Sequence, residues 1–113
     1  MNEYAAPIAS LIAKSDKARQ KLAPGTWQYR MLDDNLNALR IAAALMSGAS
    51  AAPGRYAPDD LRVAVRAFAS MIARSETAEA RATPGTAQHA LLRNRLAALR
   101  AAQTMIVNLL ERA

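Results

Sequence analysis

Apolar side chains recur along this chain at steps of three and four residues, the spacing that gathers them on one face of an α-helix. Four such stretches predict helices over about 4–22, 27–47, 59–82 and 86–112. The two clearest stripes are Leu32, Leu36, Leu39, Ala43 and Met46, and Leu92, Leu96, Leu99, Gln103, Ile106 and Leu110. The pattern therefore indicates an all-α protein.

The predicted helices are punctuated by the same tripeptide in both halves, Pro24-Gly25-Thr26 and Pro84-Gly85-Thr86. Proline disfavours helical geometry in the residue before it, and glycine can adopt the left-handed conformation that caps a helix C-terminus. The threonine hydroxyl is suited to cap the N-terminus of the next helix. Each tripeptide is thus expected to end one helix and start another.

The halves are related by an ungapped repeat of 60 positions. Laying Ile8–Met46 over Phe68–Ile106 gives 16 identical pairs. A match of that length indicates one structural unit used twice, here a helical hairpin. A lone hairpin cannot bury its apolar stripe, whereas two packed hairpins can.

The sequence therefore predicts a single domain over 1–113, an antiparallel four-helix bundle with up-down-up-down connectivity, although a crossover connection stays open. Its parts are a hairpin at about 4–47, a linker at 48–57 and a second hairpin at about 58–112. In this arrangement both Pro-Gly-Thr turns lie at one end of the bundle.

Composition narrows the class further. Alanine supplies 28 of the 113 residues, so the core is expected to be narrow and without a large internal ligand cavity. There is no cysteine, no basic leader and no apolar run near the ~20 residues of a membrane span. The expected location is the cytoplasm.

Candidate catalytic and metal-binding residues are few. His89 is the only histidine, and no second histidine or cysteine supplies a ligand set. The acidic pair Asp59 and Asp60 is explained by capping of a helix N-terminus, and no nucleophile, base and acid occur at catalytic spacing. We expect no enzyme activity, no cofactor and no metal.

Basic residues suggest one alternative function. The net charge is +6, and the stripes at helical spacing are Lys14, Lys17 and Lys21, Arg62 and Arg66, and Arg93 and Arg100. Such stripes could contact nucleic-acid phosphates, but they also suit a solvated helix face. Arg40 and Arg100 flank the seam at the same position of both repeats, which favours a structural role.

Aromatic residues suggest another function. Trp27 opens the second helix, whereas its repeat counterpart is Ala87, so the repeat geometry does not require an indole there. Tryptophan and tyrosine are common at protein-interaction surfaces, although Trp27 could equally plug the end of the core. With both turns at one end, the candidate interaction surface is Trp27, Gln28, Tyr29, Gln88 and His89. The leading interpretation is a non-enzymatic interaction or scaffolding module that binds an unknown protein or a second copy of itself.

One polar residue, Gln103, interrupts the apolar stripe of the last helix, where its counterpart is Ala43. A buried polar side chain there is expected to fix helix register.

The segments Ser15-Asp16-Lys17-Ala18, Leu22 to Gln28, and Leu36-x-Ala38-Leu39-Arg40 resemble small uncharacterised helical proteins of Burkholderia-type proteobacteria. The resemblance covers mostly the first hairpin. It implies a bacterial helical protein and brings no activity and no site residues.

Overall fold

The computed structural model describes residues 3–48 and 55–112, and this part of the chain is all-α. Its four helices lie close to the predicted ranges. They are α1 (Ala5–Gln20), α2 (Trp27–Met46), α3 (Pro58–Arg81) and α4 (Ala87–Glu111). The predicted linker at 48–57 falls mostly outside the described residues.

The N-termini of α2 and α4 are fixed by the predicted threonine caps. The Thr26 hydroxyl accepts a hydrogen bond from the Tyr29 N–H at 3.2 Å, and Thr86 accepts one from the His89 N–H at 3.1 Å. Gly25 has a φ of 95°, a conformation that favours glycine. It lies within the turn and does not cap α1, because that helix already ends at Gln20 with Lys21 as its C-cap.

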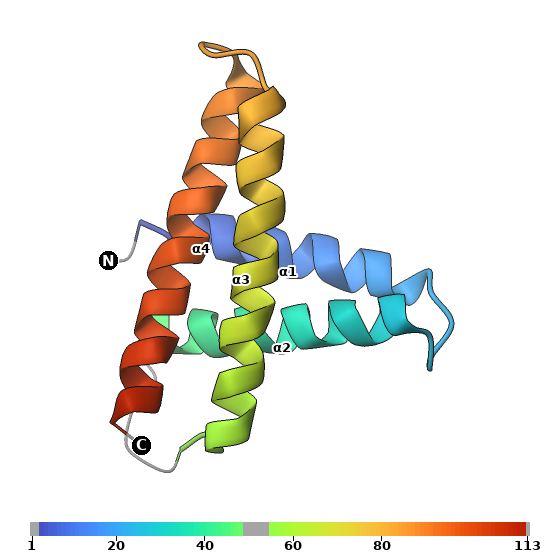
Figure 1. Ribbon diagram of the computed structural model, residues 1–113, viewed down its shortest axis with the longest axis vertical. Helices are drawn as coiled ribbons and strands as arrows, with labels where there is room; N and C mark the ends of the chain where they lie inside the picture. The colour runs from blue at the N-terminus through green and yellow to red at the C-terminus, as the bar shows by residue number, and fades with distance from the viewer. Residues whose placement is uncertain (1–2, 49–54, 113) are drawn as a thin grey trace.

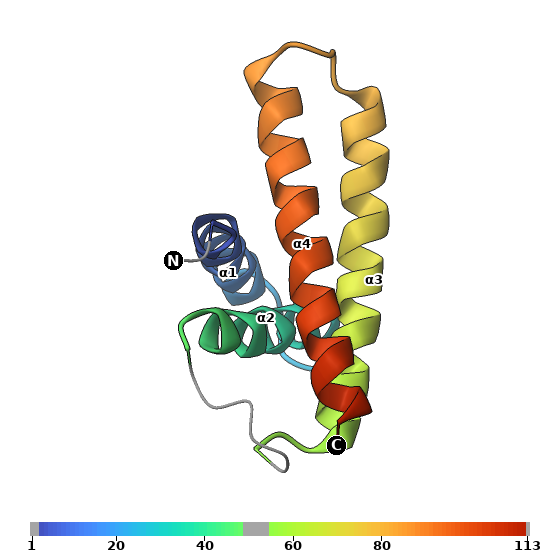
Figure 2. The same ribbon diagram turned by 90° about the vertical axis from the view of Figure 1, so that its left-hand side faces the viewer.

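The helices form two pairs that lie across each other. Figures 1 and 2 show α1 beside α2 and α3 beside α4, with the first pair crossing one face of the second. Helix α2 packs on α3 and α4, and α1 packs on α4; α1 and α3 do not contact each other within the described residues. The predicted up-down-up-down bundle is therefore not confirmed. The two Pro-Gly-Thr turns point in different directions instead of meeting at one end (Figure 1).

The distribution of large apolar side chains explains the crossing. Where the pairs meet, alanines such as Ala42 and Ala102 are fully buried and let the helices approach closely. Towards the turns the seam carries Ser15 in α1 and Ser75 in α3, where an aligned bundle would need larger apolar groups to fill the interior. The hairpins thus bury more apolar surface when they pack at one crossing point. The large side chains that are fully buried are Ile8, Leu36, Leu39, Leu61, Phe68, Leu99 and Ile106.

Gln103 links α4 to α3. Its side-chain Nε2 donates a hydrogen bond to the backbone carbonyl oxygen of Val65 at 3.1 Å, and the residue is half-buried. The bond ties one position of α4 to one position of α3, as expected for a residue that sets register.

The length and the hydropathy of the helices bear on membrane insertion. In the described ranges, no helix combines the length and the hydropathy that a bilayer crossing requires.

Candidate functional site

The most exposed large apolar side chain in the described chain is Trp27, which is 63% exposed; the next is Leu91 on α4, at 48%. Trp27 is the first residue of α2 and directly follows the Thr26 cap. The cap fixes the backbone of the turn that carries the indole. This side chain therefore lies on a rigid helix end and is largely in contact with water.

Trp27 borders an open groove between α2 and α3. The groove has a volume of about 460 Å³, and its lining side chains come from one face of each helix. They are Trp27, Arg30, Met31, Asp34 and Asn35 of α2, and Val63, Arg66, Ala67 and Ser70 of α3. A second cavity of about 440 Å³ shares Asp34 and Val63 with the first and continues along the same helices past Asn37, Arg40, Ile41 and Asp60. We call the two together the α2–α3 groove.

The lining of the groove mixes apolar and polar side chains. Ala67 is buried and Met31 and Val63 are half-buried, so their exposed sides form an apolar strip. Asn35, 5% exposed, is one of the two buried polar residues among those described. The strip offers a partner contact area bounded by polar side chains.

Cations surround the end of the groove that holds Trp27. Arg30 and Arg66 are exposed and form no ion pair within the described residues. Arg74 lies beside them, because its Nη2 donates a hydrogen bond to the Sδ of Met31 at 2.8 Å. Asp34 is likewise free of an ion pair in the described ranges and lies where the two cavities join. The Trp27 end of the groove is thus positively charged, and the carboxylate of Asp34 lies near the middle of the groove.

A third cavity, between α1 and α4, repeats the geometry of the groove. It has a volume of about 510 Å³ and is lined by Glu3, Tyr4, Pro7, Asn94 and Ala97. Each of these five lies 60 positions from a residue of the α2–α3 groove, respectively Val63, Ala64, Ala67, Asp34 and Asn37. The two hairpins therefore form equivalent hollows that carry different side chains.

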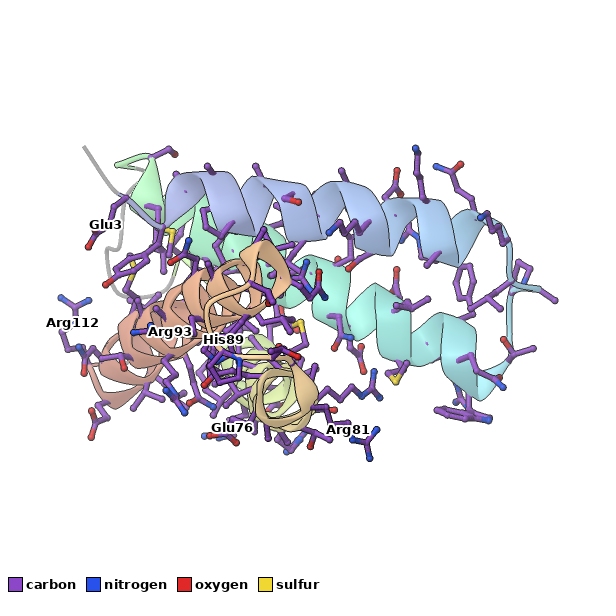
Figure 3. All side chains as sticks on the ribbon, turned by 90° about the horizontal axis from the view of Figure 1, so that it is seen from above. Glu3, Glu76, Arg81, His89, Arg93 and Arg112 are labelled. Carbon is purple, nitrogen blue, oxygen red and sulfur yellow. The ribbon has the colours of Figure 1, made fainter. Side chains whose placement is uncertain are left out.

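The structure divides the interaction surface predicted from the sequence. Gln88 and His89 belong to the first turn of α4, at the end of the second hairpin, whereas Trp27, Gln28 and Tyr29 begin α2. Figure 1 shows these two helix starts on different sides of the molecule, and Figure 3 labels His89 near the α3–α4 turn. The prediction of one shared surface assumed aligned hairpins. Of the five residues, only Trp27 lines the groove.

Tyr29 has a structural contact instead. The guanidinium of Arg19 lies 5.8 Å from the centre of the Tyr29 ring, and its Nη1 donates a hydrogen bond to Asp33 at 2.6 Å. This hydrogen bond, with smaller contributions from Tyr29 and Asp16, raises the pKa of Arg19 although partial desolvation opposes it. These contacts join α1 to α2 and leave the ring only partly exposed.

The candidate basic patch is not a single surface either. Lys14 and Lys17 are on α1, and Lys21 is its C-cap; this helix lies on the opposite side of the molecule from α3 (Figure 2). On the second hairpin, Arg62 pairs with Asp59 at 2.5 Å and Arg100 pairs with Glu76 at 2.7 Å. Arg93 is exposed on α4, and Arg66 lines the groove. No continuous basic stripe joins these side chains.

Sequence reasoning missed most of the groove, although one signal was present. Every α2 residue that lines the cavity beside Trp27 differs from the residue 60 positions later. The α2 residues are Trp27, Arg30, Met31, Asp34 and Asn35, and the residues at the corresponding positions are Ala87, Ala90, Leu91, Asn94 and Arg95. The conserved pairs of the repeat, such as Leu36/Leu96 and Leu39/Leu99, are core residues. Positions where the copies differ thus include every α2 residue of the cavity beside Trp27, whereas Ala38 and Arg40 of the second cavity are the same in both copies.

The described residues contain no group of three or more His, Cys, Asp or Glu side chains placed to hold a metal ion. No protein-family model, curated protein or solved structure matches the chain.

Proposed function

We propose that this protein is a non-enzymatic interaction module and that the α2–α3 groove is its binding surface for another protein. The observation that supports this is the exposure of Trp27 at the edge of an open hollow that also carries the apolar side chains of Met31, Val63 and Ala67. Tryptophan is strongly enriched among residues that dominate binding energy, because it combines a large apolar area with an N–H donor.

The exposed area of Trp27 is large enough to support specific binding. An indole side chain presents up to about 250 Å² of surface, and 63% of the Trp27 residue is exposed. Covering most of that area would contribute at most about 4 kcal/mol at ~25 cal/mol per Å². Losses on truncation at such positions are commonly 2 kcal/mol or more, which corresponds to at least about thirtyfold in affinity.

We also infer that the two hairpins are copies of one unit and that the first copy has specialised. The equivalent cavities support this inference, since their lining positions correspond across the 60-residue repeat. The side chains that differ lie around Trp27, while the second copy has alanine at the corresponding place. On this view the shared residues maintain the fold and the divergent ones bind.

Affinity capture from lysate, with wild-type protein and Trp27→Ala as baits, tests the proposed function. Leu91→Ala is the matched control, because it also removes an exposed apolar side chain but on the other hairpin. We expect the tryptophan variant to lose captured protein while the control retains it, with both circular dichroism spectra still helical. Equal capture by all three baits would refute the proposal. Capture that disappears after nuclease treatment would instead favour nucleic-acid binding.

A further inference from the structure

Building on the proposed function, we infer that the α2–α3 groove takes an amphipathic helix with acidic side chains from a partner protein. The groove joins an apolar strip to a set of arginines that have no carboxylate partner in the described chain. The charge of the lining, the shape of the hollow and the contrast with the equivalent α1–α4 cavity each support this partner.

Charge complementarity indicates an acidic partner. Arg30 of α2 and Arg66 of α3 stand on opposite walls of the groove at the Trp27 end, and Arg74 lies beside Met31. Arginine presents a planar fork of N–H donors that matches a carboxylate. A partner that places apolar side chains on the strip and a carboxylate on each side of it at the Trp27 end would meet Arg30 on one wall and Arg66 on the other.

The backbone of the groove favours a helical partner. Both walls are α-helices, whose N–H and C=O groups are already hydrogen-bonded within the helix. There is no sheet edge to which an extended peptide could add a strand, so a bound peptide must satisfy its own backbone groups. A helix does so. The cavity beside Trp27 is lined on α2 from Trp27 to Asn35, or eight steps of ~1.5 Å, so about two turns of a partner helix would cover that wall.

Other occupants fit less well. Asp34 lies at the junction of the two cavities, where a phosphate backbone following the groove would meet a carboxylate. A second copy of this chain brings a net charge of +6 toward a positive site. Two of its acidic residues, Asp59 and Glu76, are already paired with its own arginines.

The α1–α4 cavity provides an internal comparison. Its counterparts of Arg30 and Arg66 are Ala90 and Ala6, so the two arginine walls are missing. Glu3 replaces Val63, which puts an anion where the groove has an apolar side chain. The same hollow therefore exists twice, and only the α2–α3 version has the charge that an acidic helix requires.

The test is a selection from a display library of random 14-residue peptides on the wild-type protein, with counter-selection on Trp27→Ala. We expect enriched peptides with glutamate or aspartate flanking apolar residues at i, i+3 or i+4, and i+7. Fluorescence of Trp27, the only tryptophan, then gives the affinity of a synthetic enriched peptide and of its Lys-for-Glu version. The acidic peptide should bind at least about tenfold more tightly, the factor that ~1.4 kcal/mol produces.

Charge reversal supplies the matched control. Arg30→Glu/Arg66→Glu lowers the net charge by four, from +6 to +2, and should shift the preference to the lysine peptide. Arg93→Glu/Arg112→Glu makes the same change on α4 and at its C-cap (Figure 3) and should leave the preference as in wild type. Equal effects of the two double variants would overturn the inference, because the preference would then reflect net charge alone.

The remaining outcomes separate the inference from the function on which it depends. Enriched peptides that need Trp27 but are neutral or basic would overturn the acidic helix and leave the interaction module standing. Failure to enrich any peptide, tighter binding of a single-stranded oligonucleotide at the same site, or a dimer that Trp27→Ala dissociates would also overturn it. The lysate capture decides the interaction function independently.

Discussion

Thr26 and Thr86 form a pair of helix caps that separates the stability of the fold from the function of the groove. In both, the hydroxyl accepts from the N–H three residues later, at 3.2 and 3.1 Å. Both hydroxyls also donate to the carbonyl three residues earlier, at 2.9 and 2.7 Å. The local geometry is thus the same, but only Thr26 precedes the turn that holds Trp27.

Replacing either threonine by alanine leaves one N–H of the first helical turn without its cap. Losses of this kind cost about 1 kcal/mol, within a range of 0.5–2. For a chain of 113 residues this lowers the melting temperature by about 4 °C. We expect Thr26→Ala and Thr86→Ala to be destabilised by similar amounts in urea titrations followed by circular dichroism.

Binding should distinguish the two variants. Without its cap the first turn of α2 opens more often. The apparent affinity of a site is reduced in proportion to the fraction of time during which the site is folded for binding. If all of the ~1 kcal/mol acts on this opening, a groove-binding peptide loses up to about fivefold in affinity in Thr26→Ala. The Thr86→Ala variant should bind as wild type does.

Two results would refute this reasoning. A loss of stability in only one variant would show that the two caps are not equivalent. A loss of binding in Thr86→Ala as large as in Thr26→Ala would show that affinity follows global stability and not the order of the Trp27 turn.

Two further variants test the packing. Phe68 is fully buried among the core residues, so Phe68→Ala should lower the free energy of unfolding by about 3–5 kcal/mol. The exposed Leu91→Ala should lower it by less than about 1 kcal/mol. Equal urea midpoints for the two variants would contradict the assigned core. Gln103→Ala, which removes the hydrogen bond to the Val65 carbonyl, should cost about 0.5–1.5 kcal/mol by the same titration, and an unchanged midpoint would exclude a register role.

The helices were predictable because their signals are local. Pro-Gly-Thr sets the turn within three residues, the threonine cap acts on the next turn, and the spacing of Leu36, Leu39 and similar residues defines the buried face. All of these interactions are determined by neighbours in the sequence. Helix bounds and most of the core therefore followed from the pattern.

The crossing of the hairpins and the groove were not predictable in the same way. The crossing depends on how alanine faces such as Ala42 and Ala102 fit against each other in space, and a heptad-like stripe does not encode that fit. The groove then arises between helices of different hairpins. Trp27 was identifiable as unusual, but its neighbours Arg66 and Ser70 are brought to it only by the crossing.

The two equivalent hollows have a consequence for how such a molecule can change. Two separate hairpins related by a twofold axis would present identical hollows, so any substitution would alter both at once. In a single chain, position 27 and position 87 mutate independently, and a bulky or charged side chain can enter one hollow without entering the other. Joining the hairpins thus removes a symmetry constraint. It turns a molecule with two copies of the same surface into one with two surfaces that natural selection can modify separately.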